Sequence, residues 1–209
     1  MGALDGKVAF VSGVARGQGR AHAVRMAEEG ADIIGLDVCG PIDTVVIPPA
    51  TPGDLAETAR LVAEAGGRIH TEIVDVRDLD AVRAATGRGA ERFGGLDAVC
   101  ATAGITSRGT ALELSETAWQ TMLDVNLTGV WHTCAAAAPH LIARGGGAMV
   151  LTSSIAGLRG LFGVAHYTAA KHGVVGLMRS LAHDLAPYNV RVNTVHPTNV
   201  DTPMIQNDA

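Results

Sequence analysis

Six short runs rich in valine, isoleucine and leucine alternate along the chain with longer stretches of helical periodicity. The expected strands are residues 7–11, 32–37, 68–75, 96–100, 148–153 and 190–195. The expected helices are residues 18–29, 55–65, 79–92, 116–143 and 167–186. Connections of this length join parallel strands, and their right-handedness favours one doubly wound α/β sheet in strand order 3-2-1-4-5-6.

Composition agrees with such a sheet. Aromatic residues make up 3% of the 209 residues and hydrophobic residues 47%. The core must therefore be built from small aliphatic side chains, which is typical of parallel strands covered on both faces. We expect residues 1–209 to form a single Rossmann-type domain with helices on both faces.

Charge and cysteine usage exclude several classes of protein. The chain has 16 basic and 21 acidic residues, a net charge of −5, which argues against nucleic-acid binding. Three widely spaced cysteines indicate neither a disulfide framework nor a metal site, and fit a reducing compartment. The sequence shows no signal peptide and no apolar run that could span a bilayer, so we expect a cytoplasmic protein without membrane contact.

Residues 39–50 interrupt the strand–helix rhythm. A connection after a strand usually has two to six residues, and this one contains three prolines. It is either a variable surface loop or a flap near whatever binds at the carboxyl end of strand 32–37.

A glycine-rich turn follows the first expected strand. Gly13, Gly17 and Gly19 have the spacing of a tight turn that lets a pyrophosphate approach the backbone and the start of a helix. A turn without ligand is the alternative for an isolated match. Asp37 closes the second strand, where an acid accepts hydrogen bonds from the adenosine ribose.

Two residues bear on the choice between NAD and NADP. The carboxylate of Asp37 would repel a 2′-phosphate, whereas Arg16 in the glycine turn could pair with one. No cation follows Asp37 at Val38 or Cys39, so NAD is the predicted cofactor. Asp75 and Val76 are an expected adenine contact, and Asp75 could also cap the following helix.

A tyrosine and a lysine lie four residues apart at the start of the last expected helix. Tyr167 and Lys171 would share one helix face, where the ammonium favours the phenolate. Lowering the phenol pKa from about 10 to about 7 requires roughly 4 kcal/mol, which this ammonium and a nicotinamide cation could largely supply. Ser154 ends the fifth strand, and Asn126 is a polar residue on an apolar helix face.

Together these positions resemble the active site of the short-chain dehydrogenase/reductase family. The resemblance implies that Tyr167 is the general acid/base, that Ser154 orients the substrate oxygen, that Lys171 binds the nicotinamide ribose, and that Asn126 holds a water. It also implies cofactor contacts from the glycine turn and later loops: Gly13, Arg16, Gly17, Gln18, Gly19, Asp37, Asp75, Val76, Ala103, Gly104, Tyr167, Lys171, Pro197, Val200 and Thr202.

The activity that this resemblance implies is NAD-dependent interconversion of a secondary alcohol and a ketone. The alternatives are a non-catalytic NAD-sensing protein of the same fold, and an epimerase or dehydratase. The family also implies a homodimer or homotetramer. A narrower resemblance, carried by the 39–50 insertion and the Pro197-Thr198 pair, is to the carveol-dehydrogenase-like branch. That branch is associated with mycofactocin redox partners and tightly held NAD, which the insertion would cover.

The sequence departs from the family pattern at two places. Thr102 stands where an asparagine usually ties neighbouring strands, so it must substitute or the sheet is weaker. The chain stops at Ala209, before the usual seventh strand, which predicts an unpaired edge at strand 190–195 and suggests an incomplete copy rather than an inactive relative. No histidines have zinc spacing, and we expect structural or solvent-facing roles for them; His166 and His196 could alternatively tune the site.

Overall fold

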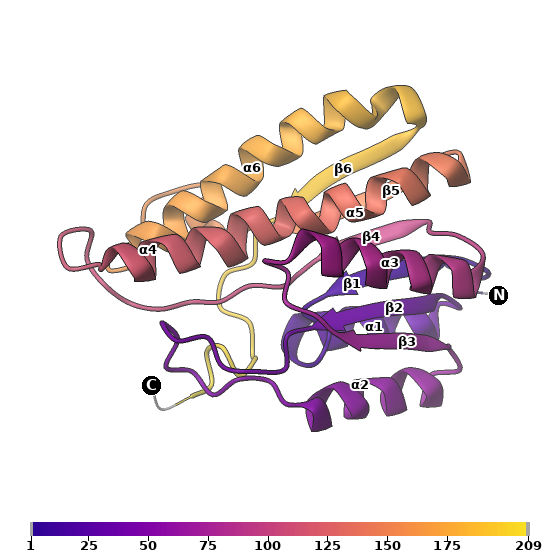
Figure 1. Ribbon diagram of the computed structural model, residues 1–209, viewed down its shortest axis with the longest axis horizontal. Helices are drawn as coiled ribbons and strands as arrows, with labels where there is room; N and C mark the ends of the chain where they lie inside the picture. The colour runs from indigo at the N-terminus through magenta and orange to yellow at the C-terminus, as the bar shows by residue number, and fades with distance from the viewer. Residues whose placement is uncertain (1, 208–209) are drawn as a thin grey trace.

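The computed structural model describes residues 2–207 and contains one six-stranded parallel sheet (Figure 1). The strand order is β3-β2-β1-β4-β5-β6, as the sequence predicted. The strands are β1 (Val8–Ser12), β2 (Asp32–Asp37), β3 (Ile69–Ile73), β4 (Ala98–Ala101), β5 (Gly147–Thr152) and β6 (Val190–Val195).

Helices cover the sheet in two layers (Figure 1). Helices α1 (Gly17–Glu28) and α2 (Pro52–Glu64) lie on one face. The other face carries α3 (Leu79–Phe93), α4 (Glu116–Leu123), α5 (Gly129–Arg144) and α6 (Ala165–Leu185). All strands point the same way, so the loops that follow them gather at one edge of the sheet.

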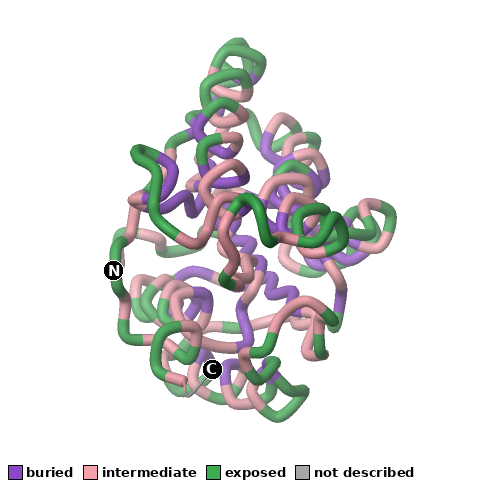
Figure 2. The backbone as a smooth tube through the Cα atoms, turned by 90° about the vertical axis from the view of Figure 1, so that its left-hand side faces the viewer, coloured by how far each residue is buried: buried purple, intermediate pink, exposed green. Residues whose placement is uncertain are grey.

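Each face of the sheet has its own apolar core. One is built from β1, β2, β4, β5 and β6 against α3, α5 and α6, and includes Phe10 and Leu151, both with no exposed area. The other packs Val11 and Ile33 against α1 and α2. Burying one such large side chain contributes about 2 kcal/mol. Figure 2 shows the buried positions concentrated inside the molecule and on the inward side of the helices.

Side-chain caps begin α2, α3 and α4. Thr51 and Asp54 form a capping box at α2 with Pro52 inside the first turn. Asp78 caps α3 through the backbone N–H of Ala81 at 3.0 Å, so the capping role considered for Asp75 falls to Asp78. Helix α1 is different, because its N-cap residue, Arg16, makes no side-chain cap hydrogen bond.

The helix expected over residues 116–143 is interrupted. A π-helical segment, Asp124–Thr128, separates α4 from α5. Its extra residue per turn changes which side chains face inward, and such segments often occur at functional sites. Asn126 lies within it and is fully buried, whereas Trp119 in α4 is 37% exposed.

Thr102 does tie neighbouring strands, which is the first of the two alternatives considered for it. Its backbone N–H donates to Ser12 Oγ at 3.2 Å, and its hydroxyl accepts from Thr152 Oγ1 at 3.4 Å. Strand β6 pairs with β5 alone among the residues described, so it forms the edge of the sheet. None of the helices within residues 2–207 is long and apolar enough to cross a membrane.

Candidate functional site

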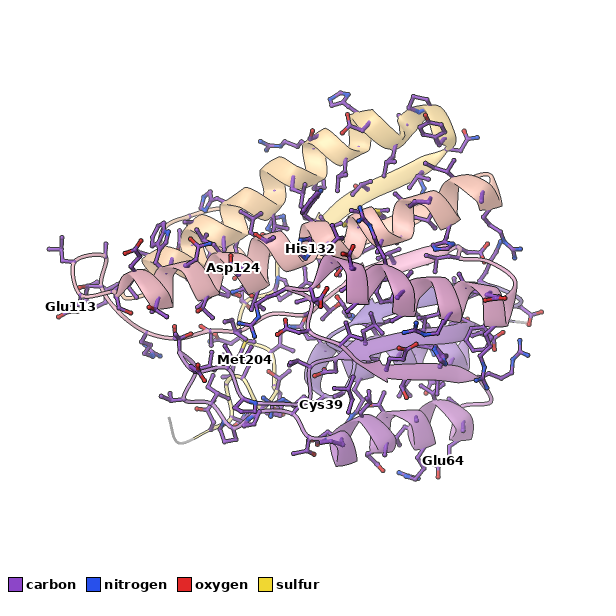
Figure 3. All side chains as sticks on the ribbon, viewed as in Figure 1. Cys39, Glu64, Glu113, Asp124, His132 and Met204 are labelled. Carbon is purple, nitrogen blue, oxygen red and sulfur yellow. The ribbon has the colours of Figure 1, made fainter. Side chains whose placement is uncertain are left out.

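Two adjoining pockets open where the carboxyl ends of the strands meet. The larger has a volume of about 720 Å³ and the smaller about 180 Å³. Gln18 at the start of α1, Gly104 in the loop after β4 and Thr202 in the segment after β6 line both. Met204 also lines both pockets. Figure 3 shows Met204, and Cys39 of the insertion, on the side of the sheet where the strands end.

The glycine turn forms the floor of the smaller pocket and depends on glycine for its own geometry. Gly17 has a φ of +57°, a conformation that favours glycine. A Cβ on Gly19 would lie 1.9 Å from the carbonyl oxygen of Gly13, and one on Gly13 would lie 2.7 Å from Ala103 Cα. The turn therefore brings the start of α1, with its free backbone N–H groups, directly to the pocket.

Asp37 is held firmly at the end of β2. One carboxylate oxygen accepts the backbone N–H of Ala15 at 2.9 Å, and the other accepts that of Cys39 at 3.1 Å. The side chain is 9% exposed and lines the smaller pocket. A fixed, buried carboxylate here can accept hydrogen bonds from hydroxyl groups and disfavours a phosphate.

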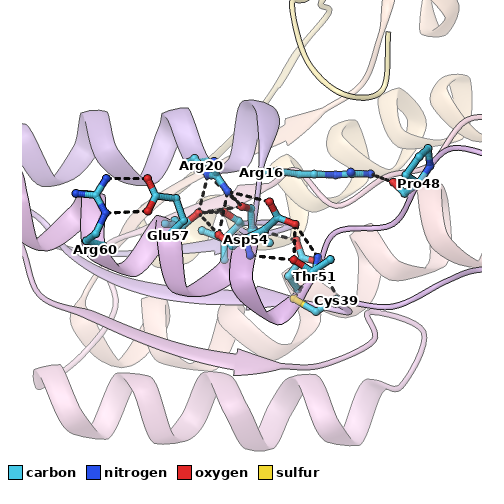
Figure 4. A network of polar contacts seen from close by, with 12 residues as sticks. Arg16, Arg20, Cys39, Pro48, Thr51, Asp54, Glu57 and Arg60 are labelled. Atoms are coloured by element: carbon cyan, nitrogen blue, oxygen red, sulfur yellow. Dashed lines mark hydrogen bonds and ion pairs between the residues drawn. The ribbon is translucent and has the colours of Figure 1, made fainter. Parts of the chain in front are cut away.

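Arg16 contacts the insertion (Figure 4). Its guanidinium group donates to the carbonyl oxygen of Pro48 at 2.6 Å. Ile42, Val45 and Ile47 of the insertion line the smaller pocket, and Ile47 also lines the larger. Residues 39–50 are thus a wall of both pockets, which supports the flap interpretation over that of a variable surface loop.

Asp75 and Val76 line the far end of the smaller pocket. Burial raises the pKa of Asp75, but hydrogen bonds from the side chain and backbone of Arg77 outweigh it and keep the pKa below its usual value. The Asp75 carboxylate is therefore anionic and already paired, with its Oδ2 2.9 Å from Arg77 Nε. An adenine contact at this position stays a prediction.

Ser154, Tyr167 and Lys171 line the larger pocket together. Ser154 follows β5 and is 8% exposed. Tyr167 and Lys171 lie one turn apart on α6, and Lys171 Nζ is 5.5 Å from the centre of the Tyr167 ring. The lysine is 3% exposed and donates to the carbonyl oxygen of Thr152 at 2.8 Å.

Burial dominates the electrostatics of this group. It lowers the pKa of Lys171 to about 8, so the amine is still mostly charged at neutral pH. It also raises the pKa of Tyr167, and a hydrogen bond with Ser154 only partly opposes this. The chain by itself therefore holds the phenol protonated, and the pKa near 7 discussed from the sequence is not reached by Lys171 alone.

Asn126 anchors the loop after β4. Its Oδ1 accepts the backbone N–H of Ile105 at 2.9 Å, and its Nδ2 donates to the Ile105 carbonyl oxygen at 2.8 Å. A Cβ on Gly104 would lie 2.8 Å from Asn126 Oδ1 and 3.7 Å from Lys171 Nζ, so this glycine leaves space between the two side chains. A water held there by Asn126 stays a prediction.

Comparison with known protein families shows to which family this chain belongs. Residues 7–209 match the short chain dehydrogenase family. This chain belongs to the short-chain dehydrogenase family. The (-)-trans-carveol dehydrogenase of Rhodococcus erythropolis is 50% identical over 210 residues, which cover 100% of this chain and 76% of that protein.

Solved structures of the family agree. Carveol dehydrogenase from Mycobacterium avium in complex with NAD superposes with a TM-score of 0.98 at 52% identity, covering 100% of this chain and 76% of that one. A short chain dehydrogenase from Mycobacterium paratuberculosis bound to NAD gives a TM-score of 0.96 at 46% identity, covering 97% of this chain and 76% of that one.

The residues present fit NAD. An uncapped helix start faces the smaller pocket, which suits a pyrophosphate, and the Asp37 carboxylate at the end of β2 suits ribose hydroxyls. All the site residues expected from the sequence line one pocket or the other. The smaller pocket is lined by Gly13, Arg16, Gly17, Gly19, Asp37, Asp75, Val76 and Ala103. The larger pocket is lined by Asn126, Ser154, Tyr167, Lys171, Pro197 and Val200, and both pockets are lined by Gln18, Gly104 and Thr202.

Sequence reasoning missed part of the larger pocket. Ser107 and Arg108 line it from the loop after β4, and Leu161 and Phe162 line it from the loop before α6. These loops follow no periodic pattern, and their only signal is that each follows the carboxyl end of a strand.

His196, a possible tuning residue, contacts the carbonyl oxygen of Ser154 through Nδ1 at 3.1 Å. The described residues contain no cluster of metal-ligating side chains.

Proposed function

We propose that this dehydrogenase interconverts a secondary alcohol and a ketone with NAD, and that Tyr167 is its general acid/base. One observation supports this most strongly. Ser154, Tyr167, Lys171 and Asn126 come from three separate segments of the chain, yet all line one cavity of about 720 Å³ that adjoins the glycine turn. A protein that only senses NAD has no need of such a convergence.

Three residues of the chain have separate roles at the reacting C–O bond. Ser154 donates a hydrogen bond to the substrate oxygen and holds it beside the phenol. Tyr167 takes the hydroxyl proton during alcohol oxidation and returns it during ketone reduction. Lys171 provides a positive charge near the ring, which favours the phenolate when the proton leaves. When bound, NAD would accept the hydride during alcohol oxidation and, as NADH, donate it during ketone reduction, and its oxidised form would add a second positive charge.

We propose NAD rather than NADP as the cofactor. The Asp37 carboxylate is fixed at the end of β2 in the smaller pocket, where its charge would repel a 2′-phosphate. Arg16 is the cation among the described residues that line the smaller pocket, and it donates to the carbonyl oxygen of Pro48 in the insertion. The NAD named for both similar crystal structures supports the same choice.

We further propose that NAD is held tightly and that residues 39–50 slow its release. Support comes from the position of the insertion, which walls both pockets and is joined to the glycine turn through Arg16. A slowly exchanging NAD must be reoxidised in place, so a redox partner of the mycofactocin kind would be needed. Purified protein should carry NAD that labelled free NAD replaces only slowly, whereas ready exchange would contradict this part of the proposal.

The activity is tested with a panel of aliphatic and cyclic secondary alcohols, and turnover is followed as the reduction of an added electron acceptor that reoxidises the tightly bound NADH in place. Matched primary alcohols serve as the comparison. We expect turnover with the secondary alcohols. Saturable NAD binding without any turnover would instead favour a non-catalytic NAD-sensing protein.

A further inference from the structure

The loop after β4 forms a fixed wall of the larger cavity. Ile105 is tied to Asn126 by two hydrogen bonds, of 2.9 and 2.8 Å. Four residues later, the backbone N–H of Gly109 donates to the Gly163 carbonyl oxygen at 2.9 Å, and Gly109 forms a parallel bridge with Val164. The segment 105–109 is therefore attached at both ends, to the π-helical segment and to the start of α6.

Ser107, in the middle of this wall, faces the cavity and contacts a buried histidine behind it. Its Oγ lies 2.9 Å from His166 Nε2, and Ser107 lines the cavity. His166 has no exposed area and directly precedes Tyr167. Burial lowers the pKa of His166, so its ring is neutral at pH 7. The other ring nitrogen, Nδ1, is buried and has no hydrogen-bond partner within the part of the chain described.

These contacts decide which nitrogen carries the proton. A buried N–H without an acceptor is rarer and more costly than an unpaired acceptor. The proton therefore belongs on Nε2, which donates to Ser107 Oγ. The Ser107 hydroxyl hydrogen then has no acceptor among residues 2–207, because its contact with His166 is the one hydrogen bond found at this side chain. It is left as a donor at the cavity wall.

We propose that Ser107, oriented by His166, is a specificity residue that donates a hydrogen bond to a second oxygen of the substrate, distinct from the oxygen that Tyr167 and Ser154 handle. The remaining wall combines apolar side chains, among them Leu161 and Val164, with polar ones, among them Arg108. The substrate class is then a secondary alcohol or ketone with a further hydroxyl, carbonyl or ether oxygen. His166 is a positioning residue. This inference rests on the proposed function.

Two ketones separate this role from general catalysis. The probes are cyclohexanone and 1,4-cyclohexanedione, reduced with NADH, with kcat/KM of the dione halved to allow for its two carbonyls. A neutral hydrogen bond changes kcat/KM by about five- to tenfold, so the wild type should prefer the dione by about that factor. Ser107→Ala should abolish the preference while leaving kcat/KM for cyclohexanone within about twofold.

His166 is tested on the same ratio. His166→Leu should reduce the preference for the dione as Ser107→Ala does, and His166→Gln should restore part of it because an amide N–H can replace Nε2–H. His172→Leu, which removes an exposed histidine from the same helix, should leave the ratio unchanged. Nitrogen-15 NMR of His166, assigned by comparison with His166→Gln, should show the Nε2–H tautomer in the wild type.

A dione preference that survives Ser107→Ala, or a wild type that lacks the preference, would overturn the inference. An Nδ1–H tautomer would do so too, because Ser107 would then donate to His166 rather than to the substrate. If the wild type reduces neither ketone, the proposed function fails for these probes, and the tautomer of His166 alone decides the inference. Ser107→Ala is a small change, so it keeps the test open if His166→Leu does not fold.

Discussion

Lys171 Nζ lies 5.5 Å from the centre of the Tyr167 ring. The two residues are one turn apart on α6, so their separation is fixed by the helix rather than by a mobile loop. The ammonium group is buried and has the Thr152 carbonyl oxygen as its partner at 2.8 Å. A positive charge near the ring favours loss of the phenolic proton, in opposition to burial, which raises the pKa of Tyr167.

Replacing Lys171 should change how stability depends on pH. Burial lowers the pKa of Lys171 to about 8 in the folded chain, whereas an unfolded lysine titrates near 10.4. Between these values the unfolded state binds the extra proton, so the free energy of unfolding should rise with pH. From pH 7 to 9.5 the rise is about 2 kcal/mol for this group.

Urea denaturation of the wild type and of Lys171→Met at both pH values gives the increase in the free energy of unfolding for each protein. The difference between the two increases is the contribution of Lys171. Lys7 is the chain's other lysine and lies at the surface beside Asp97. Lys7→Met should keep the pH dependence of the wild type. Equal pH dependence in the wild type and Lys171→Met would contradict the buried, perturbed amine.

Asp37→Asn should alter the choice of dinucleotide. The substitution keeps the size of the side chain but removes its negative charge. In the wild type this charge repels a 2′-phosphate and strengthens the hydrogen bonds that ribose hydroxyls donate to the carboxylate. We expect the Kd for NADH to rise about tenfold and the Kd for NADPH to fall about tenfold. Fluorescence titration of both dinucleotides measures the two changes. Asp43→Asn, at an exposed position of the insertion, is the matched control; an unaltered ratio in Asp37→Asn would remove the role of Asp37 in discrimination.

Arg16→Ala should loosen the insertion without weakening NADPH binding. Loss of the contact with the Pro48 carbonyl oxygen frees residues 39–50 from the glycine turn, so NADH should dissociate about five to ten times faster. Stopped-flow displacement with excess NAD gives the rate. Arg60→Ala, which removes an exposed arginine of α2, serves as the control (Figure 4). A selective loss of NADPH affinity in Arg16→Ala would show that Arg16 binds phosphate instead.

The parts of the site set by short sequence spacings were predictable. The glycine turn, Asp37 after β2, and the Tyr167–Lys171 pair each depend on neighbours a few residues away, and strand alternation gave the sheet order. The capping role considered for Asp75 was wrong because Asp78 lies directly before α3, where its side chain reaches the free N–H groups.

Features that join distant segments left no signal in the sequence. Asn126, in the π-helical segment, is hydrogen-bonded to Ile105, 21 residues away. The Ser107–His166 contact spans 59 residues. Periodicity reports only which face of an element is apolar, so it cannot show which polar groups on separate elements meet.

Tyr167→Phe tests the central claim most directly. The chain contains two tyrosines, and Tyr188, 48% exposed, provides the control Tyr188→Phe. With a secondary alcohol that the wild type oxidises, kcat of Tyr167→Phe should fall at least about a thousandfold, because no other group replaces the phenol as acid/base. The Kd for NADH should stay within about twofold, and Tyr188→Phe should behave as the wild type. Turnover by Tyr167→Phe at the wild-type rate would contradict the account.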